Sequence, residues 1–294
     1  MEVTAAGNRR HVGLIGEQRP GSAVLFGMTS DPPLVGRDGA LACLRAAIGR
    51  LAGGRGGAVW IEGGPGLGKT ELLAHALRDV PARIEVRSGP PDRGRAAGDR
   101  PLLLVADDLH RAGAAAVARW SRLHRRVRTS ALLLVTAVRP VPECDGAYAR
   151  AAACGAETVR LGPLADGDAT ELACLLGHDP HVVGTAVRDA GGNPAYLRML
   201  AHGRAAPAAP LRALVADHLS TLPRRAREML VLLAAAPAGI TAAELAARTH
   251  RPVPEVRAAM HEAVDGAILT SAGGVVRFRH PIVRRVLRMP VTPS

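Results

Sequence analysis

Short apolar runs and amphipathic stretches alternate along the first half of the chain. The apolar runs predict buried strands at 58–61, 102–105 and 132–136, and two further strands are predicted at 83–87 and 158–161. The stretches between them predict helices at 41–51, 71–78 and 114–128. Strands that alternate with helices form a doubly wound parallel sheet. The pattern therefore predicts an α/β fold with helices on both faces of the sheet and a ligand site at the carboxyl ends of the strands.

The second half of the chain has a helical pattern. Two short amphipathic helices are predicted at 166–177 and 181–190, and Asn193 and Pro194 then have the N-cap and first-turn chemistry of another helix. An Ala/Pro-rich linker is predicted at 205–210. Three more helices and a hairpin follow at 223–236, 241–249, 253–266 and 268–278, and Thr241 and Glu244 have capping-box spacing. Three helices and a hairpin are typical of a winged helix, which either enters a DNA groove or packs as a lid.

The segment after the first apolar run fits G-x-x-x-x-G-K-[ST] at every fixed position, between a predicted strand and a predicted helix. Its glycines allow successive backbone N–H groups to point at phosphate oxygens. Lys69 is the only lysine in the chain, and a P-loop lysine would reach the β- and γ-phosphates while the Thr70 hydroxyl ligates Mg²⁺. The sequence therefore predicts a nucleotide-binding P-loop made of Gly63, Gly64, Pro65, Gly66, Leu67, Gly68, Lys69 and Thr70.

Two acids follow the second apolar run, as in a Walker B strand. Asp107 would hold the Mg²⁺ shell, and Asp108 would orient or deprotonate the attacking water. Acids are also favoured in an Asx turn or a helix N-cap, which is the alternative interpretation. Arg139 follows the third apolar run. An arginine at this position either contacts a γ-phosphate or is an ordinary surface residue, and position alone does not decide between the two.

Composition narrows the function classes. The net charge is +12, but the arginines occur in every segment and aromatic residues amount to only 2%, so direct nucleic-acid binding is not favoured. The arginine-rich helix at 114–128 is interpreted as a solvated face. The four cysteines lack metal-ligand spacing and are expected to be small buried residues. No run approaches the ~20 apolar residues of a membrane span, and residues 1–30 lack a signal-peptide pattern. We expect a cytoplasmic protein with no membrane contact, and we take Met28 as a candidate start.

Together, these motifs resemble the STAND class of AAA-like regulatory ATPases, and in particular the ATPase module of the large ATP-binding LuxR-type transcriptional regulators. The segments that carry the resemblance are L-V-G-R-D, G-G-P-G-L-G-K-T, L-L-L-V-A-D-D-L-H, L-L-L-V-T-A-V-R-P, V-R-L-G-P-L, G-G-N-P-A and F-R-H-P, in that order between residues 34 and 281. Residues 1–30 mix Gly, Arg, Pro and Ser without periodicity, and we expect this segment to be disordered. With the resemblance, the sequence predicts a P-loop core at 31–164, a helical lid at 165–208 and a winged-helix domain at 209–294.

The resemblance also implies site residues. Val35, Gly36, Arg37 and Pro194 would line the adenine pocket, and Arg139 would sense the γ-phosphate. His280 would resemble the histidine that contacts the ADP β-phosphate in related switches. The sequence departs from the family pattern in a short interval after the P-loop and in Gly39, Ala40, Arg111 and Gly113, which stand where other residues are usual. Up to Ser294 the sequence has no pattern of a helical-repeat sensor or of a LuxR-type helix-turn-helix, so we expect this polypeptide not to act on transcription by itself.

These observations favour an ATP/ADP-binding, Mg²⁺-dependent switch with slow hydrolysis, whose output needs a protein partner or self-association. The alternative is an origin-recognition-like ATPase that binds DNA through its winged helix. The third predicted helix offers Arg257 and His261 among several acids, so a lid is favoured over a DNA reader. A small-molecule kinase fits the paired acids less well, and a Ras-like GTPase would need a second lysine for guanine selection.

Overall fold

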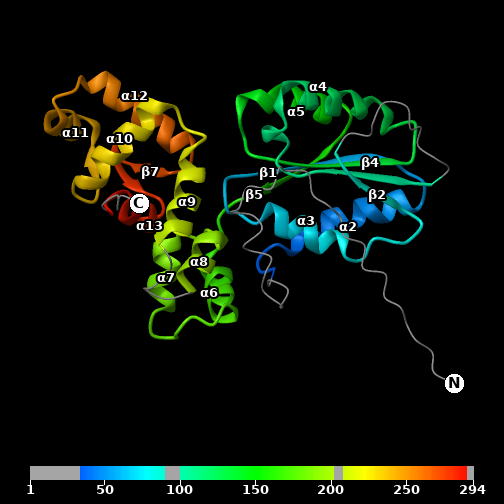
Figure 1. Cartoon of the computed structure of the whole chain (residues 1–294), viewed down its shortest axis with the longest axis horizontal. Coiled ribbons are helices and arrows are strands. Elements are labelled where there is room, and N and C mark those ends of the chain that lie inside the picture. Colours follow the sequence, from blue (N-terminus) through cyan, green and yellow to red (C-terminus); the bar gives the residue numbers. More distant parts are fainter. Residues whose placement is uncertain (1–33, 90–99, 202–207, 290–294) are drawn as a thin grey trace. The chain divides into compact units, whose positions relative to one another are not determined.

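The computed structural model describes residues 34–89, 100–201 and 208–289 (Figure 1). These residues divide into two compact units. The first comprises Gly39–Glu62 and Leu73–Arg160, and the second comprises 34–38, Gly63–Leu72 and 161–289. The predicted disordered segment 1–30 and Met28 lie outside the described residues, and the same is true of most of the predicted loop at 90–100.

The first unit is built on a five-stranded parallel sheet, which confirms the predicted α/β class. Its strands are β1 (Gly57–Gly63), β2 (Glu85–Ser88), β3 (Leu102–Ala106), β4 (Leu132–Val138) and β5 (Glu157–Leu161), in the spatial order β2-β3-β4-β1-β5. Every residue of β3 and β4 is buried. Strands buried on both faces read as continuous apolar runs, which is why the sequence predicted them. The strand order follows from tertiary packing and was not predicted.

Helices cover both faces of this sheet (Figure 1). On one face lie α2 (Asp38–Ala52) and α3 (Lys69–Leu77), and on the other lie α4 (Gly113–Leu123) and α5 (Asp145–Ala153). Trp120 of α4 is fully buried, and its indole N–H donates to the Thr136 hydroxyl of β4 at 2.8 Å. The predicted helix at 114–128 ends early, since its last turns tighten into the 3₁₀ helix η3 (His124–Arg126). Two further 3₁₀ turns are η2 (Leu109–Arg111) and η4 (Pro142–Cys144).

The second unit is helical apart from one small antiparallel sheet in the order β6-β8-β7. One hydrophobic core runs through it, from Leu164 to Val286. The predicted capping box is present, with the Glu244 amide donating to the Thr241 hydroxyl and the Glu244 carboxylate accepting from the Thr241 amide. The elements are α6 (Asp166–Leu175), α7 (Val183–Ala190), α8 (Pro194–Ala201), α9 (Ala208–Leu219), α10 (Arg224–Ala235), β6 (Ile240–Thr241), α11 (Ala242–Thr249), α12 (Val253–Asp265), β7 (Leu269–Ala272), β8 (Val275–Phe278) and α13 (Pro281–Leu287).

Two expectations were wrong. The linker predicted at 205–210 overlaps α9, which begins at Ala208; Pro210 lies in its first turn, where a missing N–H breaks no helical hydrogen bond. The cysteines were expected to be buried, but Cys174 is exposed on α6. Within the described residues, no helix combines the length and the apolar character needed to cross a membrane.

Candidate functional site

The predicted P-loop follows β1 and leads directly into α3, as its motif requires. Gly66 and Gly68 have φ angles of 75° and 86°, in the left-handed region that favours glycine. Lys69 is only 7% exposed, and its ammonium group donates to the carbonyl oxygens of Gly63 and Gly64 at 2.9 and 3.1 Å. The lysine therefore folds back over the loop that carries it, and its charge lies at the centre of the loop.

The second unit holds the tip of this loop from α8. The Asn193 side-chain amide donates to the Pro65 carbonyl oxygen at 3.0 Å, and the Ala195 amide donates to the Gly66 carbonyl oxygen at 3.2 Å. The Asn193 side-chain oxygen also accepts from the amides of Ala195 and Tyr196, which makes it the N-cap of α8. Asn193 is 1% exposed. The buried Asn193 side chain thus both caps α8 and hydrogen-bonds to the P-loop.

The L-V-G-R-D segment reaches the other side of the loop. The Arg37 guanidinium donates to the carbonyl oxygens of Leu67 and Gly162 at 3.3 and 2.7 Å. Burial lowers the pKa of Arg37, and the Asp168 carboxylate partly offsets this. A Cβ at Gly36, where φ is 64°, would collide with Asp168, so α6 packs closely on this turn. Val35 packs against the core of the second unit.

His280 lies in a buried cluster of three rings. Its Nδ1 is 2.8 Å from the Ala190 carbonyl oxygen, and its ring centroid is 5.3 Å from Tyr196 and 5.6 Å from His218. The Tyr196 hydroxyl is 2.8 Å from His218 Nδ1. Burial lowers the pKa of His280 from 6.5 to about 4, so the ring is neutral at pH 7. A carbonyl oxygen only accepts hydrogen bonds, so the proton of the neutral ring is on Nδ1.

The two predicted acids lie at the carboxyl end of β3, in the first unit. Asp107 and Asp108 are both partly exposed, and Asp108 has a φ angle of 53°, which is rare outside glycine. Its carboxylate oxygens lie 3.9 Å from His110 Nδ1 and 4.0 Å from Arg111 Nε. Residues held in this conformation are common at functional sites. At this φ angle the chain leaves the direction of β3 at Asp108, so Asp108 does not continue the strand.

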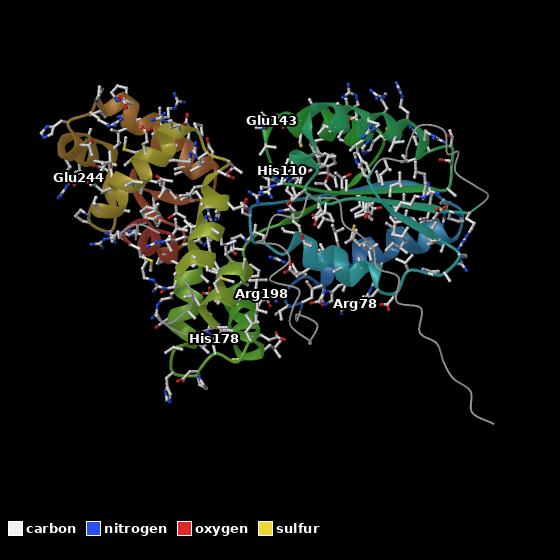
Figure 2. The ribbon with its side chains drawn as sticks, in the orientation of Figure 1. Arg78, His110, Glu143, His178, Arg198 and Glu244 are labelled. Carbon is white, nitrogen blue, oxygen red and sulfur yellow. The ribbon has the colours of Figure 1, made fainter. Side chains whose placement is uncertain are left out.

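Arg139 follows β4, the strand next to β3. It is 6% exposed, so it is not an ordinary surface arginine. Its backbone amide donates to His110 Nδ1 at 3.4 Å, which links the end of β4 to the turn after β3. Figure 2 labels His110 at this end of the sheet. The first unit therefore gathers Asp108, His110 and Arg139 at the carboxyl ends of two neighbouring strands.

The predicted site residues fall into two groups. Val35, Gly36, Arg37, the whole P-loop, Pro194 and His280 belong to the second unit, while Asp107, Asp108 and Arg139 belong to the first. Sequence reasoning identified Asn193 only as a helix cap and did not identify Asp168 or His218. The G-G-N-P turn was a usable signal for Asn193, but its partner Pro65 lies 128 residues away.

No protein-family model and no curated protein matches this chain. Solved structures do. The Orc1 protein of Aeropyrum pernix, in complex with DNA, is 16% identical with a TM-score of 0.51, over 90% of this chain and 95% of that one. A Walker-type ATPase of Pyrococcus abyssi is 12% identical with a TM-score of 0.61, over 87% and 96% of the two chains. The α/β fold, a five-stranded parallel sheet flanked by helices, matches the P-loop ATPase fold of these structures. At such low identity the likeness concerns the fold alone.

Proposed function

We propose that the chain is an ATP- and ADP-binding regulatory switch of the STAND/AAA type that hydrolyses ATP slowly. One observation carries the proposal: the tip of the P-loop is hydrogen-bonded to the start of α8, through Asn193 to Pro65 and Ala195 to Gly66. A loop that wraps phosphates is thereby joined to the helical region. A ligand shifts a conformational equilibrium only through different contacts in its two states. Through these two hydrogen bonds, a change in the P-loop on binding a γ-phosphate would change the position of α8.

The residues of the loop fit a nucleotide. Gly66 and Gly68 give the loop the left-handed backbone that lets successive N–H groups point at phosphate oxygens, and Lys69 lies in the loop with its charge buried. We assign Thr70 and Asp107 to Mg²⁺, since Mg²⁺ takes few protein ligands and fills its shell with phosphate oxygens and water. Bound Mg²⁺ would neutralise phosphate charge. Asp108 would orient the attacking water, Arg139 would meet the γ-phosphate, and Val35, Gly36, Arg37 and Pro194 would line the adenine pocket.

We assign His280 to sensing the diphosphate through its ring contact with the G-G-N-P turn. Its Nδ1 already donates to Ala190, so only Nε2 is left to face a phosphate. Nε2 donates only when the ring is doubly protonated. Its pKa of about 4 disfavours that form, and a bound phosphate would raise it. The proposal therefore implies that the part of ADP affinity that depends on His280 increases as pH falls.

The test begins with the nucleotide. Material released from the purified, denatured protein is identified by chromatography, and the protein is then titrated calorimetrically with ADP and ATP-γ-S. We expect co-purifying or tightly bound ADP. The Lys69→Ala variant should lose both nucleotides, while the exposed-surface variant Arg83→Ala should bind as the wild type does. Wild-type affinity in a folded Lys69→Ala protein contradicts the proposal.

The switch itself needs a second measurement. Hydrogen exchange is compared for the ADP and ATP-γ-S complexes. We expect different amide protection at the start of α8 and around His280. The start of α8 is hydrogen-bonded to the P-loop, and His280 is hydrogen-bonded to Ala190, next to the G-G-N-P turn. Identical exchange in the two complexes would leave a nucleotide-binding protein that does not switch.

The role in regulation extends the proposal further. A switch of this kind acts on transcription or signalling through a protein partner or through self-association of its ATPase module. Size measurement by light scattering with each nucleotide tests self-association. A mass that does not change between ADP and ATP-γ-S directs the search to a partner protein.

The second candidate is an origin-recognition-like ATPase that binds DNA through a C-terminal winged helix, and the Aeropyrum pernix Orc1 structure contains DNA. Exposed Arg257 on α12 and Arg277 on β8 favour it. Against it, α12 also exposes Glu255 and Asp265. Neutralising Arg257, Arg277 and Arg279 should then weaken DNA binding and lower its salt dependence, and binding that survives unchanged removes this candidate.

A further inference from the structure

The first unit has a second surface, at the amino edge of its sheet, opposite the carboxyl strand ends that carry Asp108 and Arg139. In a parallel sheet all strands start at one edge. An exposed arginine precedes four of the strands here: Arg55 before β1, Arg83 before β2, Arg100 before β3 and Arg128 before β4. The topology thus brings together four arginines that are far apart in the sequence.

Contacts between the turns confirm that these residues form one row. A Cβ at Gly56 would collide with the carbonyl oxygens of Val127 and Ser130, so the turns before β1 and β4 are packed together. The Leu102 amide donates to the Ala131 carbonyl oxygen at 2.8 Å, and the Glu85 amide donates to that of Pro101 at 2.8 Å. At about 4.8 Å between strands, the row is about 14 Å wide.

The end of α4 adds to the same edge. This helix runs from the carboxyl end of β3 toward the start of β4, so its last turn and η3 lie at the amino edge. Val117, Trp120, His124 and Val127 are buried, which leaves the opposite face of the helix to solvent (Figure 1). That face carries four exposed arginines, and together with the strand-start row they form what we term the basic edge: Arg55, Arg83, Arg100, Arg119, Arg122, Arg125, Arg126 and Arg128.

The acids near this edge are already paired. Asp79 pairs with Arg45 at 3.4 Å, and Glu85 and Glu157 pair with Arg87 and Arg50. None of the basic-edge arginines forms an ion pair with a carboxylate of a described residue. Residues 109–142 contain seven arginines and no acid, so this stretch supplies +7 of the net charge of +12.

Arginine-rich composition alone does not explain this concentration. In the second unit several arginines pair with acids, as in Arg224–Glu228, Arg251–Glu255 and Arg285–Asp189. The helix dipole favours cations at a helix C-terminus, but each cation stabilises the helix by only about 0.3–1 kcal/mol. Repulsion between like charges three or four residues apart offsets this stabilisation. The basic edge therefore has a charge density that its own protein does not compensate.

We propose that the basic edge binds the phosphate backbone of duplex DNA without reading its sequence. Guanidinium groups hydrogen-bond phosphate oxygens in bidentate geometry, and a duplex presents one negative charge per ~1.7 Å of its axis, so several phosphates lie within the width of the row. Single strands are held mainly by stacking on aromatic side chains, and Trp60 and Trp120 of this unit are fully buried. The B-form groove admits the exposed face of a helix such as α4, whereas the A-form major groove of RNA is too narrow.

The surface is separate from the nucleotide site. About fourteen residues of α4 and η3 lie between the two edges, or about 21 Å along the helix. DNA bound at the basic edge would therefore leave Asp107, Asp108 and Arg139 of the same unit accessible. The segment that carries the arginines starts directly after Asp108 and ends at β4, which leads to Arg139. This proposal does not depend on the switch proposed above.

The test is fluorescence anisotropy of the purified full chain with a labelled random-sequence DNA duplex, across a range of salt concentrations. If about five phosphates are contacted, the slope of log K against log salt should be about −4.5. The triple variant Arg119→Gln, Arg122→Gln and Arg126→Gln should reduce that slope to about −2 and weaken binding about 300-fold at 0.1 M salt. Glutamine preserves helix propensity.

The matched control makes the same change of charge where each arginine has an acid partner: Arg224→Gln, Arg251→Gln and Arg285→Gln. It should bind within twofold of the wild type with an unchanged slope. Thermal melts and ADP titrations show whether each variant is folded. An equal loss in both triple variants overturns the proposal, since binding would then follow net charge alone.

Four other results also overturn it. DNA binding that depends only on Arg257 and Arg277 would place DNA on the C-terminal helices and hairpin. An RNA duplex bound as tightly as DNA would replace the partner with RNA. Preferred binding of a polyglutamate peptide would identify an acidic protein instead. An absence of DNA binding at 50 mM salt would remove the surface from nucleic-acid recognition.

Discussion

Asn193 offers the sharpest test of the link between the P-loop and the helices. Its side chain makes two kinds of hydrogen bond: the amide donates to Pro65, and the oxygen caps α8 at Ala195 and Tyr196. The Asn193→Ala variant removes both. The Asn193→Ser variant keeps an N-cap acceptor but is too short to reach Pro65. The pair of variants therefore separates the cap from the contact with the loop.

The expected magnitudes follow from the burial of these groups. An N-cap contributes about 1 kcal/mol. Leaving the Pro65 carbonyl oxygen without its buried donor costs about 1–2 kcal/mol. Asn193→Ala should therefore lower the free energy of unfolding by about 2–3 kcal/mol, and Asn193→Ser by about 1–2 kcal/mol. If the loop needs this contact to keep its phosphate-binding shape, Asn193→Ser should also weaken ADP binding, by about 5- to 30-fold.

Urea unfolding and calorimetric titration with ADP measure the two quantities on the same preparations. The control is Thr241→Ala, which removes the cap of α11, a helix whose capping box faces no P-loop residue. It should lose about 1 kcal/mol of stability and keep its ADP affinity. The reasoning is refuted by an Asn193→Ser protein that loses stability but binds ADP as tightly as the wild type. Asn193 would then be a structural cap alone.

Three further predictions follow from the same geometry. Gly66→Ala should weaken nucleotide binding more than tenfold, because alanine is strained at φ 75° and its Cβ would lie 2.6 Å from the Asn193 side-chain oxygen. Titration with ATP-γ-S measures this loss, and wild-type affinity in the variant contradicts the prediction. His280 has a folded-state pKa of about 4 against 6.5 unfolded, so its neutral burial favours folding above pH 6.5, and up to about 3 kcal/mol is lost as pH falls toward 4. Urea melts at pH 7.5 and 4.5 should show a smaller difference for His280→Gln, and an equal difference would assign the dependence to other groups. Asp108→Asn should keep ATP-γ-S affinity and abolish phosphate release, whereas full turnover would remove Asp108 from the reaction.

The sequence alone predicted those features that depend on residues close together in the chain. Buried strands appeared as apolar runs because both of their faces are covered, and the capping box at Thr241 and Glu244 acts over three residues. The P-loop motif predicted its place between a strand and a helix, and the backbone freedom expected of its glycines is used at Gly66 and Gly68. Helix α5 was missed because its alanine- and glycine-rich segment, Asp145–Ala153, has no clear apolar stripe.

Features that depend on distant partners could not be predicted. The Asn193 amide meets Pro65 only after the chain has folded, and the φ angle of Asp108 follows from the turn that packs His110 against Arg139. The basic edge is the clearest example. Along the sequence its arginines are scattered and suggest compositional bias, and only the parallel topology places the strand starts together.

The contacts of the second unit also limit how a signal can pass from nucleotide to helices. Pro65 is bonded to Asn193, Asn193 ends the turn that starts at Ala190, and the Ala190 carbonyl oxygen is bonded to His280. Each step is a single hydrogen bond or one turn of backbone, and Tyr196, in contact with the His280 ring, is itself capped by Asn193. A shift of the P-loop tip therefore cannot leave the N-terminus of α8 and His280 at the start of α13 both unchanged unless the Asn193–Pro65 and Ala195–Gly66 bonds break. Loss of the Asn193–Pro65 bond alone leaves the backbone bond in place, so it should reduce the difference in hydrogen exchange between the ADP and ATP-γ-S complexes at His280, even in a variant that still binds both nucleotides.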